Sequence, residues 1–133
     1  MSRAFVFPGQ GAQAVGMGRD LAEGWPEARA VFEQVDDALG APLSATIWEG
    51  EAEALTLTEN AQPALMAMSM ATLAALEAEG VGVEAAAFVA GHSLGEYSAL
   101  CAAGAFGVGE AARLLRLRGQ AMQAAVPVGE GAM

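Results

Sequence analysis

The sequence predicts an α/β fold in which short parallel strands lie against helices. Two apolar segments, 4–7 and 85–90, have the length and composition of buried strands. Each is followed by a glycine-containing turn and then by a segment with helical patterning, which is the order of elements around a parallel sheet. The other segments show helical patterns, and no repeat or low-complexity linker interrupts them.

Length and charge limit the class of protein. The 133 residues are enough for one small domain, and 54% hydrophobic against 17% charged residues is typical of a globular chain. The net charge of −10 argues against a nucleic-acid partner. The longest apolar stretch, 64–76, is too short to cross a membrane.

The first strand, Ala4–Phe7, ends at a glycine-rich loop, Pro8-Gly9-Gln10-Gly11-Ala12-Gln13. Loops at the carboxyl end of a buried parallel strand are where α/β folds place ligand sites. The alternative is a tight turn into the next helix. A phosphate-binding loop is excluded, because the required Lys-Ser/Thr ending is absent and the chain has no lysine.

Helical segments are predicted at 17–22, 26–39, 43–48 and 61–79 before the second strand. The helix at 26–39 begins with a proline, ends before Gly40 and has an apolar stripe. Asn60 is the expected N-cap of the helix at 61–79, and Gly80 its end. The methionines of that helix, at 66, 68 and 70, are interpreted as core residues.

The second strand, 85–90, leads into Gly91-His92-Ser93-Leu94-Gly95, and helices are predicted at 94–105 and 110–125. A Gly-x-Ser-x-Gly sequence between a strand and a helix is the pattern of a nucleophile elbow. It would place Ser93 at a helix N-terminus, where free N–H groups favour negative charge. The predicted chemistry is acyl transfer through a serine ester, and the alternative is a purely structural turn.

The chain has one histidine and one cysteine. His92 is next to Ser93, and neighbouring side chains in a sharp elbow point in different directions. We therefore reject His92 as the general base and interpret it as a packed or hydrogen-bonded imidazole. Cys101 lies in the predicted helix after the elbow, and we expect it to be buried in the protein core. Because a single cysteine allows no internal disulfide, it fits a reducing cytoplasm.

A group of glutamates and the start of the chain also bear on function. Glu49, Glu51 and Glu53 are interpreted as an acidic surface patch rather than a metal site, because no histidine or aspartate is near them in sequence. The start of the chain lacks the pattern of a signal peptide, since its apolar segment is short and a glycine-rich loop follows at once. We expect a cytoplasmic protein without a metal.

Three blocks together resemble one family. They are Phe-Pro-Gly-Gln-Gly-Ala-Gln at 7–13, Gly-His-Ser-Leu-Gly-Glu-Tyr-Ser-Ala-Leu at 91–100 and Arg-Gly-Gln-Ala-Met-Gln at 118–123. The chain resembles the malonyl-CoA:acyl-carrier-protein transacylases of bacterial fatty-acid synthesis, which are related to the acyltransferase domains of polyketide synthases. The likeness runs along the whole chain.

The resemblance implies a site and a reaction. Ser93 would be the nucleophile, and the backbone N–H groups of Gln10 and Leu94 would form the oxyanion hole. Arg118 would bind the free carboxylate of the malonyl group, with Gln62 and Met122 lining the acyl pocket. The implied substrate is malonyl-CoA and the implied partner is acyl carrier protein, without a cofactor or metal. Arg113 and Arg116 are interpreted as surface charges.

The resemblance also implies the domain organisation. Residues 1–125 would be the N-terminal part of an α/β-hydrolase-like acyltransferase domain, and 126–133 the start of a ferredoxin-like subdomain. The family's base histidine lies downstream of such a segment, so this chain lacks a complete catalytic pair. Two alternatives stay open: an acyltransferase domain of a polyketide or fatty-acid megasynthase, and a catalytically incomplete fragment. A start at Met1 favours a stand-alone enzyme, and a generic esterase would not need Arg118.

Overall fold

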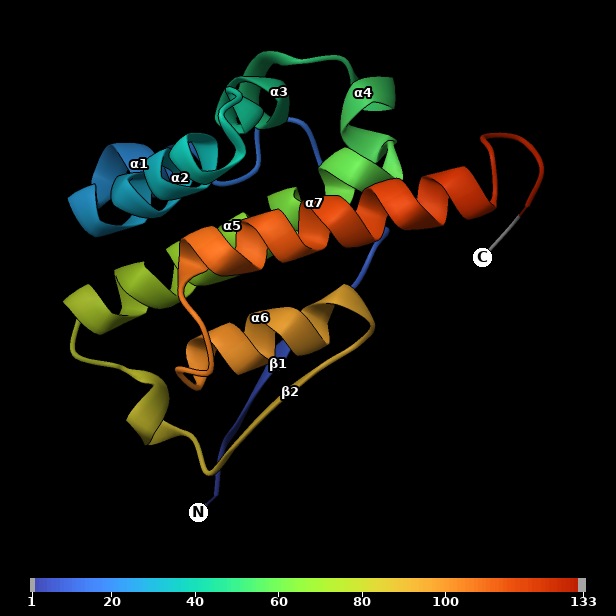
Figure 1. The fold of residues 1–133 in the computed structure, drawn as a ribbon. Helices are drawn as coiled ribbons and strands as arrows, with labels where there is room; N and C mark the ends of the chain where they lie inside the picture. The colour runs from blue at the N-terminus through green and yellow to red at the C-terminus, as the bar shows by residue number, and fades with distance from the viewer. Residues whose placement is uncertain (1, 132–133) are drawn as a thin grey trace.

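The computed structural model describes residues 2–131 and has the predicted α/β architecture. Its two strands, β1 (Ala4–Phe7) and β2 (Phe88–Gly91), pair in parallel, with Phe7 opposite Gly91. Because the strands run in the same direction and are in register, their carboxyl ends finish side by side (Figure 1). The two glycine-rich segments that follow the strands therefore begin at one edge of the sheet.

Helices form most of the described chain, and a long helical segment separates the two strands (Figure 1). They are α1 (Arg19–Gly24), α2 (Pro26–Leu39), α3 (Leu43–Glu49), α4 (Ala52–Thr56), α5 (Thr58–Ala78), a 3₁₀ helix (Val83–Ala85), α6 (Leu94–Ala102) and α7 (Val108–Ala125).

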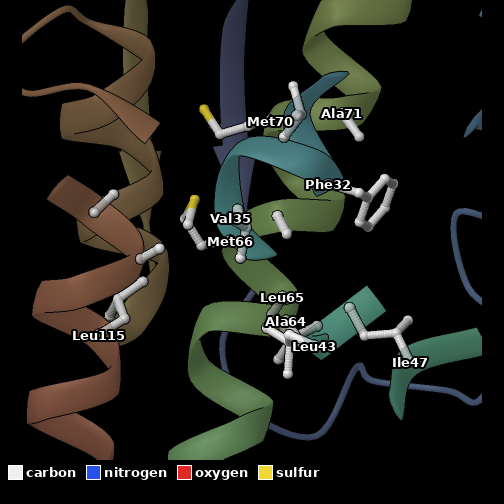
Figure 2. Packing of buried hydrophobic residues seen from close by; sticks show 14 of the residues in the cluster. Phe32, Val35, Leu43, Ile47, Ala64, Leu65, Met66, Met70, Ala71 and Leu115 are labelled. Atoms are coloured by element: carbon white, nitrogen blue, oxygen red, sulfur yellow. The ribbon is translucent and has the colours of Figure 1, made fainter. Parts of the chain in front are cut away.

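Helix α5 is the centre of the fold. Every residue from 61 to 67 is buried, as expected for a helix that has neighbours on all sides. Helices α2 and α7 pack against it, and α6 lies between α5 and the two strands (Figure 1). Figure 2 shows the resulting core, which joins side chains of α2, α3, α5 and α7. Met66 and Met70 are buried in it and Met68 is half-buried, which confirms their interpretation as core residues.

The start of α5 differs from the prediction. The helix begins at Thr58, with Leu57 as its N-cap, so Asn60 is not a cap but lies in the first turn. Its side-chain amide donates a hydrogen bond of 2.8 Å to the carbonyl of Ala54 at the end of α4. Helix α4 itself was not predicted, because five residues are too few to show a period.

The other boundaries shift by a few residues. Helix α2 is confirmed with its predicted bounds, and Gly40 ends it in the left-handed conformation at φ 61°. The helix predicted at 17–22 lies at 19–24, the strand predicted at 85–90 lies at 88–91 behind a 3₁₀ turn, the elbow helix ends at 102 rather than 105, and the last helix begins at 108 rather than 110.

One face of the sheet is open to solvent. Phe7 points towards the helices and is 7% exposed, whereas Val6 is 73% and Phe88 69% exposed on the opposite face. Both strands were predicted to be buried, and this is wrong for their outer face, which no described helix covers. Parallel sheets are normally covered on both faces, so the exposed face is unusual for such a fold.

We expect a polypeptide of residues 1–133 alone to be marginally stable and prone to association. The reason is that its sheet has two strands and leaves Val6 and Phe88 in water. Urea titration followed by circular dichroism, together with size-exclusion chromatography, measures this. A sharp cooperative transition of a monomer would contradict the expectation.

The last described residues form no regular element. Residues 126–131 are exposed, and Glu130 donates its backbone N–H to the carbonyl of Pro127 in a turn. Residues 132–133 lie outside the described part, so the assignment of 126–133 to a second subdomain stays a prediction. Between residues 2 and 131, no helix is long and apolar enough to cross a membrane.

Candidate active site

Ser93 occupies a strained turn between β2 and α6. Its φ is 56° and its ψ is −115°, and among the described residues it is the one non-glycine with a positive φ. Such a conformation is costly and persists where the surrounding structure imposes it, which is typical of functional sites. Although serine is a good helix N-cap, the Ser93 side chain makes no cap hydrogen bond here. Its hydroxyl is therefore available to other groups.

Two glycines make this turn possible. A Cβ on Gly91 would overlap the carbonyl of Gly95, and a Cβ on Gly95 would overlap the carbonyl of Phe7 at the end of β1. All of these neighbours are backbone atoms, which a rotamer change cannot move. The turn is therefore tight because strand, helix and the end of β1 touch through their main chains.

The Arg118 guanidinium lies against Ser93. Its Nη2 donates a hydrogen bond of 3.1 Å to the Ser93 Oγ, and its Nη1 donates one of 2.8 Å to the Gln62 Oε1. Arg118 lies on α7, Gln62 on α5 and Ser93 in the turn before α6, and these three helices pack against one another. The structure thus brings together the predicted nucleophile and the predicted carboxylate-binding arginine, which are 25 residues apart.

Gln62 is the buried hydrogen-bond partner of Arg118. Its side chain is 1% exposed, and its Nε2 donates a hydrogen bond of 3.1 Å to the sulfur of Met122. This bond directs the amide oxygen towards Arg118. Gln62 is therefore a buried partner of the guanidinium, while Met122 remains partly exposed beside it. The predicted role of both residues in lining an acyl pocket stays a prediction.

The two predicted oxyanion donors lie in the segments that follow β1 and β2. Leu94 is the first residue of α6, and neither its N–H nor that of Gln10 donates to a protein acceptor within residues 2–131. First-turn N–H groups of a helix have no partner inside the helix, so they are free for a ligand. The Gln10 side chain is held separately, by a 3.2 Å hydrogen bond from its Nε2 to the Thr58 hydroxyl.

Arg116 is not the surface charge that the sequence suggested. Its Nη1 donates to the carbonyl of Glu59 at 2.8 Å and to the side-chain oxygen of Asn60 at 2.5 Å. Pro63 lies in α5 four residues after Glu59, and proline has no N–H to bond that carbonyl. Arg116 therefore replaces a missing helical hydrogen bond and ties α7 to the first turns of α5.

His92 and Cys101 take no part in the contacts around Ser93. The His92 imidazole is exposed beside Gly9, and within the described chain it makes no hydrogen bond to Ser93. The ring packs against Gly9, where an added Cβ would come within 2.8 Å of its Nδ1, but the residue is exposed rather than enclosed. Cys101 lies further along α6 and is partly rather than fully buried. Burial raises the pKa of its thiol, which keeps it protonated and unreactive at neutral pH.

A groove of about 990 Å³ lies next to the site, between the start of α5 and the end of α7. Its walls include Leu57, Thr58 and Met122, together with the turn that follows α7. Thr58 and Met122 are hydrogen-bonded to Gln10 and Gln62, so the groove adjoins the residues that surround Ser93. Ser93 and Arg118 themselves do not line it.

Tyr97 is a neighbour of Arg118 that is absent from the site residues predicted from the sequence. Its ring centroid lies 5.4 Å from the central guanidinium carbon of Arg118, in a cation–π arrangement. The signal was present in the spacing, because residues four apart on a helix share a face. Tyr97 follows Ser93 by four residues and therefore points to the same side of α6.

Gly119, next to Arg118, sets how closely α7 approaches α5. A Cβ at this position would come within 2.6 Å of the Glu59 Cα and 2.8 Å of the Thr58 carbonyl oxygen. We expect Gly119→Ala to lower the free energy of unfolding by about 1–3 kcal/mol, because backbone cannot yield without moving a helix. The guanidinium of Arg118 should shift as well, because α7 carries it. Urea unfolding of the full-length protein measures the first effect.

Gly109 on the same helix provides a matched control. A Cβ there would lie 3.5 Å from the Ala38 Cβ, which is an ordinary contact. Gly109→Ala should be neutral or stabilise the helix by up to about 1 kcal/mol, because alanine has the higher helix propensity. Equal effects of the two substitutions would contradict the close approach at Gly119.

Comparison with known proteins identifies the family. The family model for the acyl transferase domain matches residues 4–133. The malonyl CoA-acyl carrier protein transacylase of Bacillus subtilis strain 168 is 52% identical over 130 residues. A crystal structure of acyl-carrier-protein-S-malonyltransferase from Bartonella henselae superposes with a TM-score of 0.93 at 63% identity, over 97% of this chain. A malonyl-transacylase in complex with a type II PKS acyl-carrier protein superposes with a TM-score of 0.89 at 44% identity, over 96% of this chain.

These relatives are longer than the chain. The match covers 98% of the chain but 40% of the Bacillus subtilis protein, and 41% and 40% of the two solved chains. The family match, in contrast, spans nearly every residue and includes all three motifs around Ser93, Gln10 and Arg118. The chain belongs to the acyl transferase domain family.

Proposed function

We propose that the protein containing this chain transfers a malonyl group from coenzyme A to the phosphopantetheine thiol of acyl carrier protein, through an ester on Ser93. The observation that carries the proposal is the hydrogen bond from Arg118 to the Ser93 hydroxyl. It places a cation next to the atom that would hold the acyl group, where the free carboxylate of a malonyl ester would be within reach.

The lack of a carboxylate partner for Arg118 among the described residues supports this choice of acyl group. The chain has 16 acidic residues, yet within residues 2–131 no carboxylate pairs with Arg118, and the ion pairs formed are those of Arg19 with Glu23 and Glu49. A half-buried guanidinium without an acidic partner retains unused N–H donors. A malonyl carboxylate would use them, whereas an acetyl group would leave them unpaired.

The first half of the reaction would form the ester. The Ser93 Oγ would attack the thioester carbonyl carbon while a base takes its proton, and the carbonyl oxygen would become an oxyanion. The free N–H groups of Leu94 and Gln10 would donate hydrogen bonds to this oxyanion. Collapse would break the C–S bond, release protonated coenzyme A and leave malonyl-Ser93.

The second half would reverse the first with a different thiol. The base would take the proton of the carrier's phosphopantetheine thiol as its sulfur attacks the ester carbonyl, and the same N–H groups would stabilise the second oxyanion. Collapse would break the C–O bond to Ser93, whose oxygen would take the proton back from the base, and would leave the malonyl group as a thioester on the carrier. His92 does not contact the Ser93 hydroxyl, so the base would be a histidine outside this chain, as the family resemblance implies.

The comparison with relatives supports the proposed substrate and partner. Acyl carrier protein is the partner in the solved complex of a related malonyl-transacylase, and the relatives carry malonyl CoA in their names. We also propose a cytoplasmic location, which is supported by the single cysteine of the chain.

The test is a transfer assay with the full-length protein. It should move one malonyl group from malonyl-CoA to holo acyl carrier protein, detected as a mass increase of the carrier, and transfer acetyl from acetyl-CoA far more slowly. Apo carrier, which lacks the thiol, serves as the control and should gain no mass. Failure to load holo carrier, or equal rates for both acyl groups, would overturn the proposal.

A further inference from the structure

The Tyr97 ring lies against Arg118 without using any of its N–H donors. The in-plane donors of the guanidinium bond Gln62 and Ser93, while the ring lies 5.4 Å from its central carbon. We propose that Tyr97 is a positioning residue for acyl-group selection, which holds the guanidinium of Arg118 ready for a carboxylate. This inference rests on the function proposed above.

The geometry explains why an aromatic ring suits this role. When a carboxylate binds, it would take donors that Arg118 now directs to Ser93. The arginine would then lose one of its protein contacts. The contact with the Tyr97 ring does not compete with the carboxylate, because it involves the π face and not an acceptor atom. Tyr97 can therefore hold the guanidinium both before and after the substrate binds.

The absence of an acidic partner gives the ring a second role. A carboxylate beside Arg118 would stabilise the cation but would also compete with the substrate for the same donors. Within residues 2–131 no such carboxylate is present. The negative face of an aromatic ring stabilises a partly desolvated cation without that competition.

Tyr97 is itself held in place. It starts the second turn of α6, one turn beyond Ser93, and its ring is partly buried against the main core. The hydroxyl makes no hydrogen bond to the part of the chain between residues 2 and 131. The ring face, rather than the hydroxyl, is therefore the part that would act on Arg118.

The experiment compares Tyr97→Leu with Tyr97→Phe in the full-length protein, by kcat/KM for malonyl-CoA and for acetyl-CoA. Leucine removes the π face, so malonyl transfer should fall about 3- to 10-fold, mainly through KM, while acetyl transfer changes less than about 2-fold. Phenylalanine keeps the ring and should retain the preference for malonyl. If the leucine variant does not fold, Tyr97→Met replaces it as a flexible apolar side chain.

A double-mutant cycle separates this role from general packing. In an Arg118→Ala background, Tyr97→Leu should no longer lower malonyl transfer, because the cation is absent. Cys101→Ala, one turn further along α6, is the matched control: it should lower the melting temperature slightly and leave the malonyl-to-acetyl ratio unchanged. Equal loss for both substrates in Tyr97→Leu, or the same loss in Tyr97→Phe, would overturn the inference.

The failure of the proposed function would look different. If the wild-type protein shows no preference for malonyl, or if Arg118→Ala keeps that preference, the function fails before Tyr97 is tested. If wild type and Arg118→Ala behave as proposed and Tyr97→Leu keeps the wild-type ratio, only the role of Tyr97 is wrong.

Discussion

We expect Ser93→Ala to abolish covalent loading of the full-length protein by malonyl-CoA. Wild type should gain the mass of one malonyl group on the peptide that contains Ser93, and the variant should gain none. Without the hydroxyl no ester forms, so transfer to the carrier should fall by roughly 10⁴-fold or more. Stability should fall by no more than about 1 kcal/mol, because the Ser93 side chain makes no cap bond to α6 and loses one hydrogen bond from Arg118. Intact-mass and peptide mass spectrometry provide the measurement.

Ser98 offers a matched control on the same helix. Its side chain is fully buried, and its hydroxyl has no hydrogen-bond partner among residues 2–131. Ser98→Ala removes that unpaired hydroxyl, so it should leave loading intact and be neutral or stabilising by about 1 kcal/mol. Loading that persists in Ser93→Ala, or that is lost in Ser98→Ala, would contradict the assignment of the nucleophile.

The sequence alone located the sharp turn at Ser93 because an elbow is a local structure. Strand, turn and helix lie within a few residues, and the glycines at 91 and 95 reflect contacts inside the same segment. The same holds for α2, whose proline start, apolar stripe and glycine end are all contained in one stretch. Where local pattern and tertiary contact agree, the sequence is sufficient.

The start of α5 could not be predicted in this way. Asn60 has the residue type of a cap, but its side chain instead bonds the end of α4 and Arg116 of α7. The first turns of α5 are thus held by two other elements, including the guanidinium that bonds the Glu59 carbonyl. Such long-range bonds override local capping preference, and a single sequence gives little sign of them.

The exposed sheet face has a related explanation. Apolar patterning indicates that Val6 and Phe88 belong against other atoms, but it does not say which segment covers them. In the described structure the helices pack on the Phe7 side, where Phe7 is buried while Phe5 and Val89 are partly buried, so the prediction of burial is correct for this side only in part.

We expect Arg118→Ala to lower kcat/KM for malonyl-CoA, because it removes a charge-assisted pair. The loss of transition-state stabilisation should be about 2–4 kcal/mol. Acetyl transfer should fall much less, or rise, because acetyl makes no use of the guanidinium. The loss should appear largely in KM, since the carboxylate is present in ground and transition states alike. Part of it should appear in kcat, because the pair also positions the carbonyl against Ser93.

The contacts of Arg118 sharpen this prediction. Removing the guanidinium also leaves the buried Oε1 of Gln62 without its donor, which should lower the free energy of unfolding by about 1–3 kcal/mol. This loss affects transfer of both acyl groups alike. Arg118→Lys keeps a charge but loses the planar fork that bonds Gln62 and Ser93 together, so it should rescue malonyl transfer only in part. The lysine variant therefore separates charge from geometry.

Arg113, which is exposed on the same helix, is the matched control. Arg113→Ala should leave kcat/KM unchanged for both substrates. The decisive quantity is the malonyl-to-acetyl ratio of kcat/KM in the four proteins. A loss of stability lowers kcat/KM for both substrates together, whereas loss of the group that binds the carboxylate lowers kcat/KM for malonyl-CoA alone. If Arg118→Ala reduces both equally, the guanidinium serves the packing of α5, α6 and α7 rather than the choice of acyl group, and Ser93 must obtain its selectivity from another residue.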